Sequence, residues 1–106
     1  MKLVLYYANW CPHCKTYLSK WKNIKNNLDI ECFEYEDKQD REHIIKENIE
    51  YYPTLKFFDS NGNSHLIQDM SLNGIISFIK LKNNTNNNNI YLFIIAFIIL
   101  SYLVYI

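Results

Sequence analysis

The feature that most constrains the fold of this chain is a pair of cysteines. They are predicted to lie at the start of a helix, directly after a short strand. Residues 3–7 form an apolar run typical of a β-strand, and apolar side chains recur at helical spacing over residues 17–28. Pro12 suits the first turn of that helix, because its missing N–H would have no partner there. Cys11 therefore falls at or next to the helix N-cap and Cys14 inside the first turn, so that a reversible disulfide can join the two thiols.

The position of Cys11 at the N-terminus of a helix predicts a reactive thiolate. The unpaired N–H groups and the positive end of the helix dipole stabilise a thiolate over a thiol, so we expect Cys11 to be the nucleophile. Cys14, one turn on, is placed to attack a mixed disulfide and release the client, which makes it the resolving thiol. His13 adds a titratable, partly cationic neighbour that favours the thiolate. We expect Pro12 and His13 to tune the redox potential.

Charge and composition divide the chain. Its 106 residues allow one small domain, and a formal net charge of zero gives no reason to expect a nucleic-acid partner. No charged residue follows Lys82. We therefore predict a domain over residues 1–82, a flexible asparagine-rich linker over 83–89, and a further element over 90–106.

The segment 90–106 is apolar on every side and contains no glycine or proline. As a helix it would reach roughly 25 Å, at the short end of what spans a bilayer. The sequence thus predicts a single-pass C-terminal transmembrane helix. Lys80 and Lys82 precede it and no cation follows, which favours a cytosolic redox domain. The apolar run at residues 3–7 is too short for a signal peptide.

The remaining segments predict an alternation of strands and helices. Asn61-Gly62 is typical of a tight hairpin turn. Cys32 is expected to pack in a strand, whereas His43 and His65 fall in polar segments and are expected to be solvated. The first two strands, joined through a helix, should be parallel. We predict strands over 2–7, 29–36, 55–59 and 64–68, and helices over 12–27, 37–48 and 71–82.

Two motifs resemble the thioredoxin superfamily over residues 1 to about 82. Residues 10–15, Trp-Cys-Pro-His-Cys-Lys, look like the active site of protein disulfide isomerase domains, which have glycine where this chain has Pro12. Residues 52–58, Tyr-Pro-Thr-Leu-Lys-Phe-Phe, look like the segment that holds the cis-proline in that family. The resemblance implies an α/β thioredoxin-like fold with a minimal βαβαββα core, in which a mixed sheet is flanked by helices. It also implies a cis bond before Pro53 and a client surface of Trp10, Tyr52 and Pro53.

Departures from the family pattern sharpen the functional prediction. Leu5 stands where thioredoxins and the isomerases carry a buried acid, and the glutathione signature of glutaredoxins is not evident. We therefore predict a membrane-anchored thiol-disulfide oxidoreductase without a cofactor. It would act on protein dithiol or disulfide clients and depend on an unidentified redox recycling partner. Its composition also resembles thioredoxin-like proteins of large DNA viruses, which would make the membrane that of a host or a virion.

Two other functions stay open. One alternative is a metal-binding module: Cys11 and Cys14 supply half of the ligands of a tetrahedral zinc site, and Cys32 or His13 would assist them. The other is a non-catalytic scaffold that keeps the fold for binding. A scaffold has no chemical need for both cysteines together with the proline segment, and no second Cys-x-x-Cys completes a metal site, so the sequence favours the oxidoreductase.

Overall fold

The structure, a computed structural model, describes residues 1–104, and the side chains of all of these except 84–93 and 104. Strands and helices alternate in the predicted order, βαβαββα. The elements are β1 (Lys2–Tyr7), α1 (Pro12–Asn26), β2 (Glu31–Glu36), α2 (Arg41–Lys46), β3 (Thr54–Phe58), β4 (Ser64–Leu66) and α3 (Leu72–Val104).

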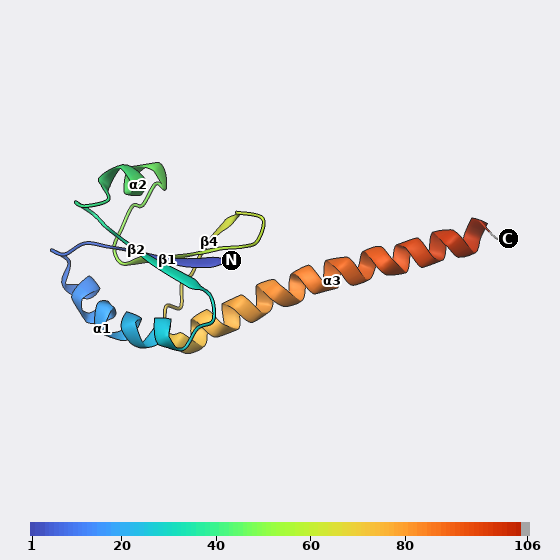
Figure 1. The fold of residues 1–106 in the computed structure, drawn as a ribbon, viewed down its shortest axis with the longest axis horizontal. Helices are drawn as coiled ribbons and strands as arrows, with labels where there is room; N and C mark the ends of the chain where they lie inside the picture. The colour runs from blue at the N-terminus through green and yellow to red at the C-terminus, as the bar shows by residue number, and fades with distance from the viewer. Residues whose placement is uncertain (105–106) are drawn as a thin grey trace. The chain divides into compact units, whose positions relative to one another are not determined.

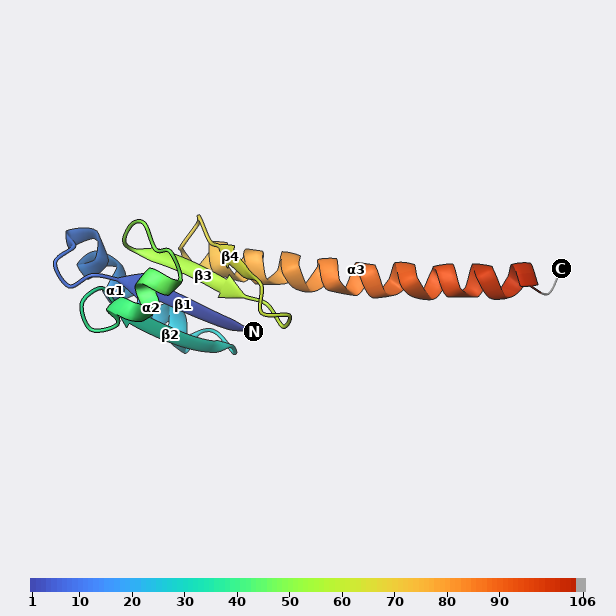
Figure 2. The ribbon, with the colours of Figure 1, turned by 90° about the horizontal axis from the view of Figure 1, so that it is seen from above.

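The four strands form one mixed sheet in the order β2-β1-β3-β4. The β1 and β2 strands are parallel, as predicted, with Tyr7 opposite Glu36, and β3 runs antiparallel to β1, with Phe58 opposite Lys2. Figures 1 and 2 show α1 and α2 on opposite faces of this sheet. The thioredoxin-like α/β fold predicted from the sequence is therefore confirmed for this part of the chain.

The central strand β1 is buried on both faces. Its residues Leu3, Val4, Leu5 and Tyr6 are at most 1% exposed. Val4 and Tyr6 pack with Ile44 of α2, and the alternation along a strand turns the other two side chains toward the face covered by α1. A strand covered by helices on both sides reads as a continuous apolar run, which is the pattern at residues 3–7.

The second helix is shorter than the predicted 37–48. The Glu36 carboxylate accepts hydrogen bonds from the backbone N–H groups of Lys38, 3.1 Å away, and Gln39, 3.3 Å away. The Asp40 carboxylate accepts one from the Glu36 N–H at 2.9 Å. Acidic side chains thus satisfy the backbone of a turn here, and a regular helix begins only at Arg41.

Two histidines that the sequence places in solvent have partners in the structure. The His43 ring stacks on Tyr35, with ring centroids 3.9 Å apart. The His65 Nε2 atom lies 3.0 Å from an Asp59 carboxylate oxygen. Cys32 is half-buried, and its thiol donates to the Ile30 carbonyl at 3.5 Å. Ring stacking and a hydrogen-bond contact within the hairpin both depend on side chains brought together by the fold, so hydrophobic spacing could not reveal them.

The last helix differs from the predicted division of the chain. A single helix, α3, includes residues 83–89, which the sequence predicts to be a flexible linker. Once a helix has started, adding an asparagine costs at most about 0.7 kcal/mol relative to alanine, so a run of asparagines can continue it. By its internal contacts the chain divides into two compact units, residues 1–72 and 73–106.

The predicted transmembrane segment 90–106 extends beyond the residues that are fully described. Within the described part of the chain, no helix is both long and apolar enough to cross a membrane.

Candidate active site

The two thiols lie at the start of α1. Cys11 is the N-cap residue, with the extended backbone angles φ −90° and ψ 119°, and Pro12 opens the helix. The Cys11 N–H donates to the Ala8 carbonyl at 3.1 Å, which closes the turn that leads out of β1. Both thiols are free; Cys11 is 6% exposed and Cys14 is fully buried. Only Cys11 is therefore open to an approaching client.

The surroundings of the two thiols shift their pKa values in opposite directions. The backbone N–H of Cys14 lowers the pKa of Cys11, and the Cys14 thiol and the His13 N–H add to this against the effect of burial. Burial is the largest of the causes that raise the pKa of Cys14 to about 11, and the hydrogen bond and charge of Cys11 contribute to the same rise. The predicted stabilisation of the Cys11 thiolate by helix N–H groups is thus present. His13 contributes through its backbone, and its side chain is exposed.

The proline segment before β3 faces the thiols. The Tyr52–Pro53 peptide bond is cis, which confirms the prediction made from the resemblance. The Cys11 thiol points at the Tyr52 carbonyl oxygen, with 3.9 Å between sulfur and oxygen. Tyr52 also packs against the cluster of Ala8, Cys11 and Cys14. The fold therefore brings Tyr52 and the cis bond to Pro53, both predicted to contact clients, next to Cys11.

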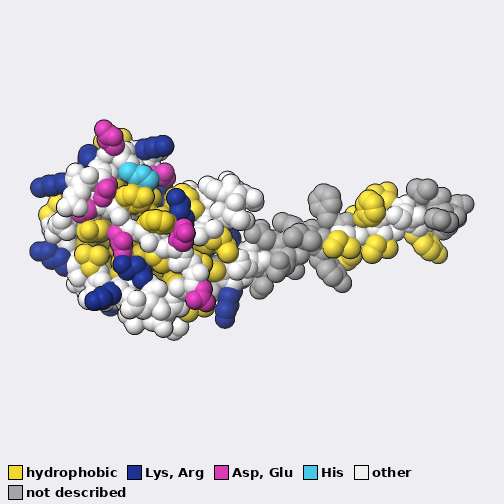
Figure 3. Space-filling model, viewed as in Figure 1, with side chains coloured by type: hydrophobic (Ala, Val, Ile, Leu, Met, Phe, Trp, Pro, Cys, Tyr) yellow, Lys and Arg dark blue, Asp and Glu magenta, His cyan; other side chains and the backbone are white. Residues whose placement is uncertain are grey.

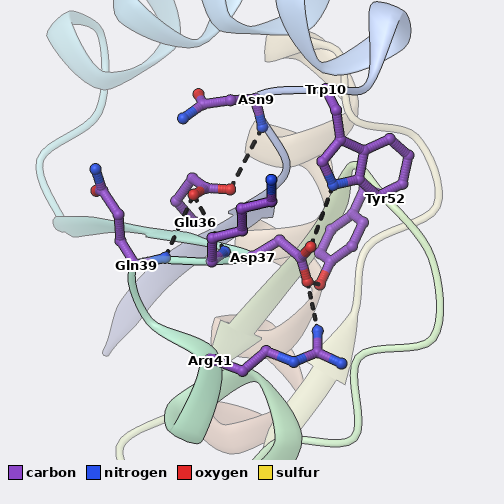
Figure 4. Close-up of polar contacts among 8 residues, drawn as sticks. Asn9, Trp10, Glu36, Asp37, Gln39, Arg41 and Tyr52 are labelled. Carbon is purple, nitrogen blue, oxygen red and sulfur yellow. Dashed lines mark hydrogen bonds and ion pairs between the residues drawn. The ribbon is translucent and has the colours of Figure 1, made fainter.

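The Asp37 carboxylate is a part of this region that sequence reasoning missed. One oxygen accepts a hydrogen bond from the Tyr52 hydroxyl at 2.6 Å, and the other accepts one from the Trp10 indole N–H at 3.2 Å. Arg41 forms an ion pair with Asp37 at 2.6 Å, so three side chains converge on one carboxylate (Figure 4). These partners lower the pKa of Asp37, the Tyr52 hydrogen bond most of all. Because Trp10 lies 27 residues from Asp37, no local pattern could have signalled the contact.

A second acid, Glu36, holds the segment that leads to Cys11. It is 3% exposed, and its carboxylate accepts a hydrogen bond from the Asn9 N–H at 3.4 Å. The neighbouring Asp37 N–H donates to the Tyr7 carbonyl at 2.9 Å. The end of β2 therefore fixes the backbone between β1 and Cys11, as Figure 4 shows for Asn9.

The third cysteine is not part of this site. Cys32 pairs with Leu3, near the first residues of β1, whereas Cys11 follows the end of that strand. Among the residues that the structure describes, no three cysteine, histidine, aspartate or glutamate side chains gather where they could hold a metal ion. The arrangement that the structure does show is a dithiol facing a cis-proline.

Comparison with known proteins identifies the family. The family model named Thioredoxin matches residues 1–81. The chain belongs to the thioredoxin family. Its thioredoxin domain is 30% identical over 93 residues to a protein disulfide-isomerase of Schizosaccharomyces pombe, covering 81% of this chain and 26% of that protein. It is 33% identical over 61 residues to a putative protein disulfide-isomerase of Dictyostelium discoideum, covering 56% of this chain and 15% of that protein. The chain thus spans about a quarter or less of these relatives.

Solved structures agree with this thioredoxin fold. The Trx4 domain of ERdj5 superimposes with a TM-score of 0.68 at 18% identity, over 79% of this chain and 80% of that chain. Thioredoxin 1 of Thermosipho africanus gives a TM-score of 0.62 at 20% identity, over 78% of this chain and 99% of that one. At these identities the likeness shows the fold.

Proposed function

We propose that this chain is a membrane-anchored thiol-disulfide oxidoreductase that exchanges disulfides with protein clients. The observation that carries the proposal is the asymmetric thiol pair. Cys11 is partly accessible with a lowered pKa, and the buried Cys14 stands beside it with a raised one. The names of the relatives, protein disulfide-isomerases, support the same chemistry.

Reduction of a client disulfide proceeds in two exchanges. The Cys11 thiolate attacks one client sulfur, which forms a mixed disulfide and releases the other client sulfur as a thiolate that takes up a proton. Cys14 then loses its proton and attacks the Cys11 sulfur. This second exchange closes the Cys11–Cys14 disulfide and frees the second client sulfur, so two electrons pass to the client. The reverse sequence oxidises a client, and a recycling dithiol or disulfide partner resets the pair.

The pKa of Cys14 suits the order of these steps. Two of the causes that raise it are the charge of Cys11 and the hydrogen bond between the thiols. Both vanish once Cys11 is bonded to the client, which leaves burial as the main barrier to deprotonation. Cys14 is therefore held as a thiol before the client arrives and becomes easier to ionise when the mixed disulfide has formed.

Aromatic side chains around the thiols favour a protein client over a small thiol. Trp10, which directly precedes Cys11, has a side chain that is 60% exposed, and Tyr52 packs against the thiol cluster. Exposed aromatic rings of this kind provide apolar contact area at low entropic cost when a peptide binds. Trp10, Tyr52 and Pro53 form the client surface in this proposal.

Cysteine variants of the full chain test the proposed reaction. Cys11→Ser should abolish reduction of a protein disulfide, and Cys14→Ser should accumulate a mixed disulfide that gel electrophoresis without reductant detects. Cys32→Ser is the matched control and should turn over normally. Poising the wild type in glutathione buffers gives the potential of the pair and hence the direction it favours. An active Cys11→Ser protein would refute the proposal.

The membrane anchor is proposed from the apolar end of α3. Large side chains such as Phe97, Leu100 and Leu103 are more than 60% exposed there, and Figure 3 shows apolar groups along this stretch. The Ser101 hydroxyl donates to the Phe97 carbonyl at 3.0 Å, so this polar group is satisfied within the helix. Lys80 and Lys82 before the segment favour a cytosolic redox domain in this proposal.

Expression of the full chain with a glycosylation reporter at either end tests the anchor and its orientation. We expect the protein to stay with membranes in alkaline carbonate and only the C-terminal reporter to be modified. Release into the carbonate supernatant would refute the anchor, and modification of the N-terminal reporter alone would reverse the orientation.

A further inference from the structure

The Asp37 carboxylate joins two segments that flank the nucleophile. Trp10 directly precedes Cys11 in the chain, and Tyr52 reaches the Cys11 sulfur through its backbone carbonyl. Both side chains donate to Asp37, one to each carboxylate oxygen. We propose that Asp37 is a positioning residue that locks Trp10 and Tyr52 into a fixed aromatic rim for recognition of protein clients. This set of three residues is called the Asp37 clasp, and the inference rests on the proposed function.

The geometry of the clasp fixes both rings. The Trp10 and Tyr52 rings meet edge to face, with centroids 6.0 Å apart and planes at 86°. Edge-to-face contact orients two rings, but it does not fix where along the surface the pair lies. The hydrogen bonds to Asp37 add that anchor, because its backbone N–H is itself bonded to the Tyr7 carbonyl at the end of β1. The rim is thereby tied to the central strand.

Burial indicates that the clasp is more than a surface ion pair. The Asp37 side chain is 14% exposed, whereas its partner Arg41 is 60% exposed. An exposed ion pair alone contributes little to stability, and a hydrogen bond to a charged group that is shielded from water contributes more. The two aromatic donors, rather than Arg41, are therefore the partners that hold the carboxylate in place. Figure 4 shows Arg41 reaching Asp37 from the side away from Trp10.

The clasp should act on recognition and leave the thiol chemistry unchanged. The groups that lower the pKa of Cys11 are the Cys14 and His13 N–H groups and the Cys14 thiol, all at the start of α1. Asp37 reaches the site through side chains that stand beside the nucleophile. Loss of the clasp should therefore weaken binding of a folded or extended protein client, while a small disulfide, which needs no rim, reacts as before.

Four variants of the full chain test this inference. Tyr52→Phe keeps the ring and removes only the hydroxyl, Asp37→Ala removes the acceptor, and the double variant combines both changes. Asp59→Ala is the matched control, because Asp59 is also a hydrogen-bonded aspartate but follows β3 at the end remote from Pro53. Each variant is assayed with insulin as the protein disulfide and with 2-hydroxyethyl disulfide as the small one, and its redox potential is measured.

We expect a selective rise in KM for insulin. Asp37→Ala should raise it about fivefold to tenfold and Tyr52→Phe about threefold, which correspond to the loss of hydrogen bonds to a charged group. The double variant should be no worse than Asp37→Ala, because both changes remove the same bond. Rates with 2-hydroxyethyl disulfide and the potential should stay as in the wild type, and Asp59→Ala should match the wild type throughout.

Three results would overturn the clasp: an unchanged KM in Tyr52→Phe, equal losses with both disulfides, or additive effects in the double variant. Tyr52→Phe carries the test if Asp37→Ala does not fold, because it keeps the ring and every backbone contact. A wild type that reduces neither disulfide would refute the proposed function instead, so the two failures are distinct.

Discussion

Asp37 and Asp59 are two aspartates with lowered pKa values at opposite ends of β1. Asp37 follows Glu36, which pairs with the last residue of β1, and Asp59 follows Phe58, which pairs with the first. The Asp59 carboxylate accepts hydrogen bonds from the Asn61 N–H at 2.9 Å and the Asn63 N–H at 3.0 Å, within its own turn. Its contact with His65 is the largest cause of its lowered pKa.

The partners of these two aspartates differ in their distance along the chain. Asp59 bonds to residues at most six positions away, whereas Asp37 bonds to Tyr52 and Trp10, which are 15 and 27 positions away. The first carboxylate shapes one hairpin. The second ties three segments together next to the thiols. The same side chain therefore builds a turn at one end of the sheet and organises a functional region at the other.

The largest expected effect is the difference in reactivity between the Cys11 and Cys14 thiols, which lie near Asp37 beyond the end of β1. The pKa of Cys11 lies below its ordinary value, mainly because of the Cys14 backbone N–H, whereas burial raises the pKa of Cys14 to about 11. We therefore expect Cys11 to be alkylated at least about tenfold faster than Cys14 at pH 7, because only the thiolate reacts. Iodoacetamide labelling of the reduced full chain from pH 6 to 9, read by mass spectrometry, measures this difference.

Cys32 and the hairpin provide the controls for that measurement. Burial raises the pKa of Cys32, so its labelling should begin at a higher pH than that of Cys11. Asp59→Asn should leave the Cys11 profile unchanged, because Asp59 lies at the other end of β1. Equal labelling of Cys11 and Cys32 would contradict the proposed asymmetry, and a shifted profile in Asp59→Asn would show that the two ends of the sheet are coupled.

The same contrast explains how far the sequence alone could predict this molecule. The thiol pair at the start of α1 and the hairpin at Gly62 follow from short motifs with known backbone preferences, and the cis bond before Pro53 follows from the resemblance to the thioredoxin superfamily. The Asp37 clasp depends on side chains that meet only after β1, β2 and β3 are assembled. The apolar spacing also did not predict that α2 is short and that α3 is continuous. The carboxylates that cap the turn before α2 leave this spacing unchanged, and so does the continuation of α3 through the asparagines.

A change at the hairpin should alter stability without altering catalysis. Gly62 has a φ of +82°, and an added Cβ would meet no atom within 4 Å, so Gly62→Ala fits in space but strains the backbone. We expect it to lower the free energy of unfolding by about 1 kcal/mol. Urea denaturation in detergent measures this loss, and KM for insulin should equal that of the wild type. A change in that KM would mean that the hairpin takes part in client recognition.

The smallest expected effect is in acid stability, where both aspartates contribute. A carboxyl group whose pKa is lower in the folded chain stabilises it above the unfolded value of about 3.9, and this contribution is lost as pH falls through the folded value. Asp37→Asn and Asp59→Asn should each therefore lose less stability than the wild type between pH 5 and pH 3, by an amount smaller than the Gly62→Ala effect. Urea denaturation at both pH values measures the difference.

The KM for insulin at neutral pH separates the two aspartates. Only Asp37→Asn should raise this KM, because only the Asp37 carboxylate accepts hydrogen bonds from Trp10 and Tyr52. If Asp59→Asn raised that KM equally, the functional distinction between the two aspartates would fail.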